Sequence, residues 1–88
     1  MTIRADRPSN GSRTTTLSTL AVGAKAVVRD VRGERSVARR LMEMGVLPGT
    51  PIEVVRIAPL GDPVELRLRG YALSIRHAEA AQVQVEVA

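Results

Sequence analysis

The sequence predicts a mainly β protein: a small, strongly bent β-barrel of about five short strands, with one short α-helix after the first strand. Three observations support this fold class. The chain has 88 residues, which is room for one small domain. Several short segments are rich in β-branched residues or alternate between apolar and polar residues, and glycine and proline turns separate them. One other segment carries apolar residues at helical spacing.

The composition is that of an ordinary globular domain, with 44% hydrophobic and 25% charged residues and a net charge of +4. The chain contains no cysteine, which excludes disulfides, cysteine zinc sites, iron–sulfur clusters and thiol nucleophiles. No apolar run approaches the roughly 20 residues of a membrane-spanning helix, so we expect no membrane insertion. A small chain without cysteine fits the cytoplasm, where we expect this protein to reside.

Residues 1–16 are rich in Ser, Thr, Asn, Gly and Pro and contain few apolar residues. Such a segment buries too little apolar surface to offset the entropy of ordering it. We therefore expect a flexible leader over residues 1–16 and a folded domain over residues 17–88. The domain begins with a short turn, in which Leu17 and Leu20 enter the core.

The first strand is predicted over residues 24–31, and the helix follows it. Ser36 is the predicted N-cap of the helix because its hydroxyl can accept a free backbone N–H group, and Gly33 is a competing start. Apolar residues then recur at the spacing of one buried helical stripe. The stripe comprises Val37, Leu41 and Met44, and Ala38 and Met42 widen it.

The helix is predicted to end firmly. Gly45 can adopt the left-handed conformation of a helix C-terminus, and Val46 supplies the hydrophobic contact that usually follows. Residues 47–50 (LPGT) have proline and glycine at the two central positions of a type II turn.

The second half of the chain is predicted to supply the remaining strands. In order, we expect a strand over 51–57, a rigid connection over 58–63, a strand over 64–69, a turn at 70–71, a strand over 72–76, a helical turn over 77–81 and a last strand over 82–87. The first and last strands of a small barrel usually pair, which removes exposed sheet edges, and we expect the same pairing here.

Catalytic and metal-binding groups are scarce. His77 and Glu79 form a histidine–carboxylate pair in the sequence, whereas iron and zinc sites normally need three or more converging ligands. The chain has one histidine and neither a nucleophile-elbow motif nor a glycine-rich phosphate-binding motif. We therefore expect no enzymatic activity, no metal site and no cofactor, and we interpret His77 as an exposed turn residue.

The arginine-rich stretch in and before the helix has three interpretations. Arg35 and Arg39 are four residues apart and share one helix face. This face can be simply solvated, can dock on an acidic protein surface, or can hold the phosphates of a nucleic acid. Glu43 lies at helical spacing from Arg39 and Arg40, so its negative charge compensates part of their positive charge. Because Tyr71 is the single aromatic residue available for stacking on a base, nucleic-acid binding is not expected.

The connection APLGDP over residues 58–63 is longer and stiffer than a hairpin needs. A pre-ordered exposed loop loses little entropy on binding, so we expect this loop and the helix face to recognise a partner. The predicted partner-binding residues are Arg35, Arg39, Pro59, Leu60, Gly61, Asp62 and Pro63.

The segment RRLMEMGVLPGTPIEVVRIAPLGDPVEL, followed by GYALSIRHAEA and an end that alternates in valine, resembles the FeoA family of small cytoplasmic proteins of bacterial ferrous iron uptake. The resemblance covers residues 17–88 and is most specific between Leu41 and Pro63. It implies an SH3-like barrel, in agreement with the fold predicted from the residues. It also implies an accessory of the membrane ferrous-iron transporter FeoB, which carries a cytosolic GTPase domain.

The resemblance also implies structural roles for individual residues, and it transfers no catalytic residue. The helix-to-strand elbow of the family matches Leu41, Gly45, Pro48 and Gly49. The family's loop matches Pro59, Gly61, Asp62 and Pro63. Leu73 and Arg76 match the strand before the final turn.

The sequence therefore predicts a non-enzymatic protein that docks on the cytosolic part of FeoB and supports or regulates transport. Two alternatives stay open. One is a nucleic-acid-binding barrel of ribosomal or translational type. The other is the C-terminal barrel of iron- and manganese-responsive repressors, which would need a DNA-binding helix-turn-helix and a metal-binding dimerisation region upstream, where we expect only the leader.

Overall fold

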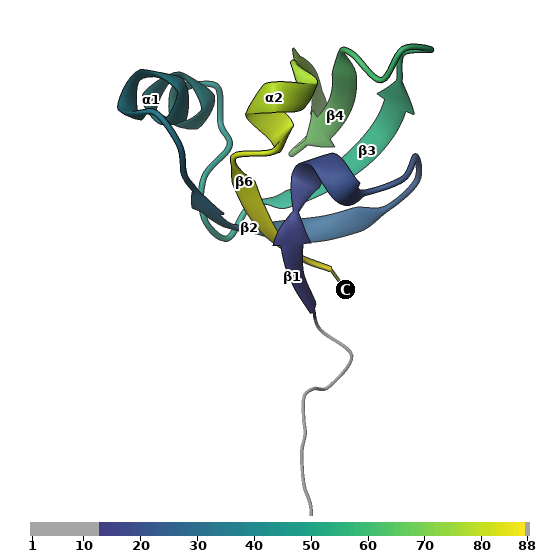
Figure 1. Cartoon of the computed structure of the whole chain (residues 1–88). Helices are drawn as coiled ribbons and strands as arrows, with labels where there is room; N and C mark the ends of the chain where they lie inside the picture. The colour runs from purple at the N-terminus through teal and green to yellow at the C-terminus, as the bar shows by residue number, and fades with distance from the viewer. Residues whose placement is uncertain (1–12, 88) are drawn as a thin grey trace, which may run out of the picture.

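One antiparallel sheet dominates the structure. The computed structural model describes residues 13–87 and places six strands in the order β1-β6-β2-β3-β4-β5 (Figure 1). The strands are β1 (Arg13–Thr16), β2 (Lys25–Val31), β3 (Pro51–Ile57), β4 (Val64–Leu68), β5 (Tyr71–Ile75) and β6 (Val83–Val87). Each strand pairs antiparallel with its neighbours in this order.

Three short helical segments connect the strands. The 3-10 turn η2 (Leu17–Thr19) follows β1, α1 (Arg35–Glu43) follows β2, and α2 (His77–Ala80) precedes β6. Figure 1 shows α1 at the left and α2 between α1 and the strands β3 and β4. The predicted helix after the first long strand and helical turn before the last strand are confirmed. Over residues 13–87, no helix has the length and hydropathy needed to cross a membrane.

The core is built from the inward-facing residues of the strands and from leucines of η2 and α1. Alternate residues of a strand point to opposite faces of a sheet, so the alternating segments of the sequence bury one side each. The largest fully buried side chains are Leu17, Leu41, Leu66, Leu68, Val28, Val46, Val54, Val83 and Val85. Leu41 is the residue of α1 that enters most deeply, as its place in the predicted stripe indicated.

The mainly β class is confirmed, although the sheet has six strands and stays open. β2 and β6, which correspond to the first and last predicted strands, pair as expected, with Val28 opposite Val85. β1 lies on the other side of β6, and β1 and β5 are the two ends of the sheet order among the described strands. The predicted removal of both edges is therefore wrong.

Strand β1 lies inside the segment that we expected to be a flexible leader, so residues 13–16 of that segment belong to the sheet. Its backbone pairs with β6, from Arg13 opposite Val87 to Thr16 opposite Gln84. The Thr19 hydroxyl also donates a hydrogen bond to the Thr16 carbonyl oxygen at 2.8 Å. The prediction relied on apolar content and therefore missed this strand, which is ordered by backbone pairing and hydroxyl contacts. Threonine is β-branched and is favoured in strands. Residues 1–12 of the predicted leader lie outside the described residues.

Helix α1 begins earlier than predicted. Its N-cap is Glu34, and Ser36 lies within the first turn, where its hydroxyl donates to Glu34 Oε1 at 3.0 Å. The predicted Ser36 cap is therefore wrong. Gly33, at φ +89°, turns the chain into the helix one residue before Glu34, so the helix has already started at Ser36.

The hairpin between β4 and β5 turns at Arg69 and Gly70, one residue before the predicted turn. Both residues have positive φ, at 43° and 90°, as a two-residue turn of type I′ requires. Tyr71 was expected in the turn but starts β5 opposite Leu68.

Candidate partner-binding surface

Arg35 and Arg39 lie on the exposed side of α1, whereas Ala38 and Leu41 on its other side are buried. The ion pairs among the described residues include neither arginine, and Glu43 makes none with Arg39. Both guanidinium groups are therefore available to an anionic partner.

Arg40, unlike Arg35 and Arg39, forms an ion pair, and its partner is Glu79 of α2. Glu79 is buried, and its Oε1 accepts a hydrogen bond from the backbone N–H of Arg76 at 2.8 Å. The Glu79 N–H in turn donates to the Arg76 carbonyl oxygen at 3.0 Å. Glu79 thereby fixes both the start of α2 and its position against α1.

The loop over residues 58–63 connects β3 and β4 and is ordered by its own backbone hydrogen bonds. The Gly61 N–H donates to the Ala58 carbonyl oxygen at 2.7 Å, and the Ala58 N–H donates to the Pro63 carbonyl oxygen at 3.1 Å. Leu60 lies between these bonds and is 96% exposed. An apolar side chain held so far into solvent on an ordered loop suits recognition of a partner.

Helix α2 lies between the loop and α1. Asp62 Oδ1 accepts a hydrogen bond from the backbone N–H of His77, the first residue of α2, at 3.0 Å. In Figure 1 the connection between β3 and β4 is at the right and α1 is at the left. The structure therefore does not bring the two predicted parts of the partner-binding set together. They are separate surfaces, linked through α2.

The predicted elbow has a structural role at the end of α1. The Val46 N–H donates to the Leu41 carbonyl oxygen and the Gly45 N–H to the Met42 carbonyl oxygen, both at 3.0 Å. These are the two hydrogen bonds of a Schellman motif, and they require the positive φ of +106° at Gly45.

The second half of the elbow joins the helix to the sheet. The Thr50 N–H donates to the Leu47 carbonyl oxygen at 3.0 Å, and Gly49 has φ +89°, as the predicted type II turn over Pro48 and Gly49 requires. The Gly49 N–H also donates to the Val28 carbonyl oxygen of β2 at 2.7 Å. The elbow thus anchors the exit of α1 on the first long strand.

Leu73 and Arg76 also have structural positions. Leu73 of β5 is half-buried against the core. Arg76 was expected in the strand, but β5 ends at Ile75 and Arg76 is the N-cap of α2.

Nearly the whole described segment matches one known family. The sequence matches the model of the FeoA domain over residues 15–87. The chain belongs to the FeoA family. It is also 42% identical over 71 residues to the Fe(2+) transport protein A/Fe(2+) transporter FeoB fusion protein of Porphyromonas gingivalis. That match covers 81% of this chain but only 8% of the much longer fusion protein.

Two solved structures share the fold of this FeoA domain. The FeoA-like protein of Clostridium acetobutylicum superposes with a TM-score of 0.78 at 42% identity, covering 84% of this chain and 86% of that one. FeoA of Stenotrophomonas maltophilia, an SH3 domain protein in complex with zinc, superposes with a TM-score of 0.70 at 32% identity, covering 81% and 88%. The SH3-like fold implied by the resemblance is confirmed.

The described part of this FeoA domain does not gather metal ligands. It contains no group of three or more His, Cys, Asp or Glu side chains that could hold a metal ion. His77 is exposed at the start of α2, and its backbone N–H is the group that contacts Asp62.

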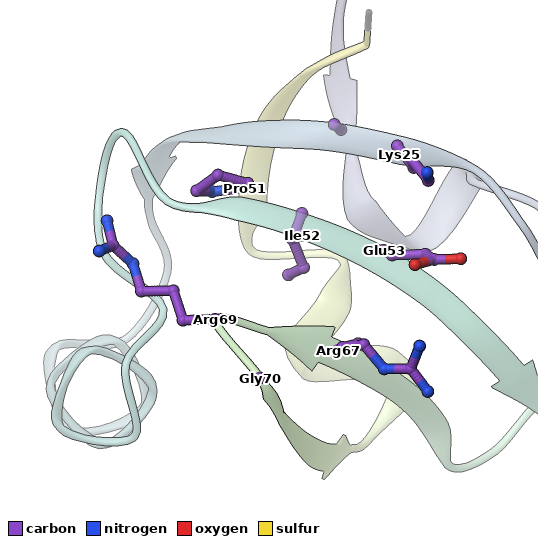
Figure 2. A pocket seen from close by; sticks show the side chains of 8 residues that line it. Lys25, Pro51, Ile52, Glu53, Arg67, Arg69 and Gly70 are labelled. Carbon is purple, nitrogen blue, oxygen red and sulfur yellow. The ribbon is translucent and has the colours of Figure 1, made fainter.

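A hollow of about 230 Å³ opens over β2, β3 and β4 of this FeoA domain. Figure 2 shows Lys25, Glu53 and Arg67 in a row across the three strands, as their cross-strand register requires. Arg69 lines the other end of the hollow, beside Pro51. The sequence did not indicate this hollow because residues from three separate strands line it.

Tyr71 is the residue whose role the sequence analysis missed. Its hydroxyl donates a hydrogen bond to the Met44 carbonyl oxygen at 2.6 Å, and a Cβ at Gly45 would overlap that hydroxyl. The lone aromatic residue of this FeoA domain thus packs against the Schellman turn. Local spacing gave no signal for this contact, because the fold brings Tyr71 to Met44 from 27 residues away.

Proposed function

We propose that this protein is a non-enzymatic, cytoplasmic accessory of ferrous iron uptake that docks on the cytosolic part of a FeoB-type membrane transporter. The supporting observation is the Porphyromonas gingivalis relative, in which a segment 42% identical to this chain belongs to one polypeptide with FeoB. Fusion holds two proteins together permanently, so separate chains of the same families need a surface that brings them together.

The described surface fits docking better than catalysis. Its single histidine is exposed at the start of α2, and no three His, Cys, Asp or Glu side chains of residues 13–87 gather into a group that could hold a metal ion. The free arginines of α1 and the exposed, ordered loop are the kind of groups that recognise another macromolecule.

We assign the docking contacts to Arg35 and Arg39 on α1 and to the loop of Pro59, Leu60, Gly61, Asp62 and Pro63. Because these two surfaces lie on opposite sides of α2, docking uses them as two separate contacts on the transporter. The hydrogen bond from His77 to Asp62 and the ion pair of Glu79 with Arg40 hold the two contacts in a fixed relation.

Binding of the purified cytosolic region of the FeoB-type transporter from the same organism tests this function. Isothermal titration should detect a complex with the full chain, and the double variant Arg35→Glu/Arg39→Glu should bind more weakly. The loss of affinity should be larger at low salt than at high salt, because salt screens the interaction between exposed charges. An absence of binding, together with undiminished ferrous iron uptake in cells lacking the protein, would overturn the proposal. A mobility-shift assay with RNA and DNA covers the nucleic-acid alternative, for which binding must fall steeply with salt.

A further inference from the structure

Three exposed apolar side chains lie in or beside the C-terminal end of α1. The described residues include five large apolar residues that are exposed, of which Met42, Leu47 and Tyr71 are 38%, 46% and 44% exposed. Met42 lies in the last turn of α1, its carbonyl oxygen accepts the Gly45 N–H at 3.0 Å, and the Tyr71 hydroxyl lies against Gly45. Leu47 comes directly after this turn, and its N–H donates to the Gly45 carbonyl oxygen at 3.0 Å.

Arginines without ion-pair partners border these apolar residues. Arg39 precedes Met42 by three residues and shares its side of α1, and Arg35 continues the same row. Arg69 stands on the other side, in the hairpin turn just before Tyr71, and reaches toward Pro51 (Figure 2). The described residues give none of these three arginines an ion pair.

We propose that the α1-end surface, formed by Arg39, Met42, Leu47, Arg69 and Tyr71, binds an acidic segment with an apolar anchor side chain in the transporter's cytosolic region. This inference rests on the proposed docking function and names the chemistry of its contact. The apolar centre takes the anchor, and the flanking guanidinium groups pair with carboxylates, for which arginine has two-point geometry. Glu43 is the one carboxylate on the exposed face of α1, so cations prevail there.

The α1-end surface is pre-organised for binding. The Schellman hydrogen bonds fix the backbone between Met42 and Leu47, and the bond from the Tyr71 hydroxyl to the Met44 carbonyl oxygen fixes the aromatic ring. A rigid surface loses little conformational entropy when a partner binds. Tyrosine and arginine are also the residue types that most often dominate binding energy at protein interfaces.

The observations favour a protein segment over an anionic membrane. Membrane-surface binding relies on clustered cations beside an amphipathic helix whose apolar face inserts among the lipids. The apolar face of α1 is instead occupied by the protein's own core, through Ala38 and Leu41. The exposed apolar groups come from a helix end, a turn and a hairpin, which suits one anchor side chain of a protein partner better than a lipid surface.

Matched substitutions test the α1-end surface in the full chain. Leu47→Ser and Arg39→Glu should each weaken binding to the purified cytosolic region about tenfold or more, as central apolar and arginine contacts do. Val22→Ser and Arg56→Glu are the controls, because Val22 is 58% exposed and Arg56 is exposed without an ion pair on other parts of the molecule. Both controls should stay within about twofold of the unmodified chain. Thermal unfolding and amide spectra verify that all four variants fold.

The outcomes separate the surface from the proposed function. Binding that the two test variants weaken and the two controls leave unchanged supports the α1-end surface. If the cytosolic region binds all variants equally, the surface is wrong while the docking function stands. If the unmodified chain does not bind, the α1-end surface is wrong, and the docking function is wrong as well when cells lacking the protein show undiminished ferrous iron uptake. Binding to phosphatidylglycerol vesicles that depends on Leu47 and Arg39, without binding to the cytosolic region, would assign the surface to a membrane and overturn the inference.

Discussion

Both oxygens of the Glu79 carboxylate have partners from different parts of the chain. One forms the ion pair with Arg40 of α1, and the other accepts the Arg76 N–H at the start of α2. A buried carboxylate is costly unless it is paired and hydrogen-bonded, so these two contacts depend on one another. From the spacing in the sequence, we expected Glu43, and not Glu79, to compensate the charge of Arg40. The sequence could not predict Glu79 because the fold brings it to α1 from 39 residues away.

Glu79→Gln should lower the free energy of unfolding by about 1–2 kcal/mol. The amide oxygen can still accept the Arg76 N–H, but the charge that pairs with Arg40 is lost; the value stays modest because the Arg40 side chain is 53% exposed. Urea denaturation measures the change. Glu43→Gln is the matched control, since Glu43 is exposed and makes no ion pair with another described residue, and it should stay within about 0.5 kcal/mol. Equal stabilities of the two variants would contradict the role assigned to Glu79.

At the scale of single elements, the end of α1 was predictable and its start was not. Gly45 and Val46, and then the proline and glycine of the following turn, are local signals whose geometry depends on a few neighbouring residues. The start was misplaced because Ser36 is a good cap by type, whereas the positive φ of Gly33 turns the chain so that Glu34, two residues earlier, is the N-cap. Residue type alone does not show which of two nearby signals the backbone follows.

Two glycines of the elbow allow a matched test of the contact between Tyr71 and the helix end. Gly45 and Gly49 both have positive φ, at +106° and +89°, but a Cβ meets the Tyr71 hydroxyl at Gly45 and nothing within 4 Å at Gly49. Gly49→Ala should therefore cost only the backbone strain of about 1–2 kcal/mol. Gly45→Ala should cost the same backbone strain and should also displace Tyr71. Loss of the hydrogen bond from the Tyr71 hydroxyl to the Met44 carbonyl oxygen should lower the free energy of unfolding by about 1 kcal/mol more.

Urea denaturation of both alanine variants, alone and combined with Tyr71→Phe, measures this difference. Removal of the hydroxyl removes the nearest overlapping atom and leaves the ring Cζ 3.2 Å from the added Cβ. Gly45→Ala should therefore cost less in the Tyr71→Phe background, whereas Gly49→Ala should cost the same in both. If Tyr71→Phe changes the cost of the two alanine substitutions equally, the proposed contact does not govern the helix end.

At the scale of the molecule, the alternating strands and the single helical stripe were sufficient to predict a small β fold with one principal helix. Burial of one strand face leaves a clear pattern in the sequence, and that pattern located β2 to β6. The pattern does not report how surface segments meet in space. The sequence named the loop over residues 58–63 and the arginines of α1 as partner-binding groups but did not show that α2 separates them. It also did not indicate the contact of Tyr71 with the helix end. It also missed β1, whose four residues show no apolar alternation.

We expect β1 to stabilise the whole domain. A comparison of a chain that begins at Arg13 with one that begins at Leu17 tests this expectation. Loss of β1 removes the backbone pairing of Arg13–Thr16 with β6 and should lower the free energy of unfolding by about 1–3 kcal/mol. For a domain of this size, each kcal/mol corresponds to a shift of about 4–8 °C in Tm, which calorimetry resolves readily.

The shorter chain should also associate with itself. Without β1, the valine-rich strand β6 becomes the edge of the sheet, with unpaired N–H and C=O groups and no proline to block another strand. Sedimentation velocity across a range of concentrations should detect larger species for the chain beginning at Leu17 and not for the chain beginning at Arg13. If both chains have the same Tm and remain monomeric, β1 neither stabilises the sheet nor protects β6, and the true domain boundary lies at Leu17 as the composition of residues 1–16 first indicated.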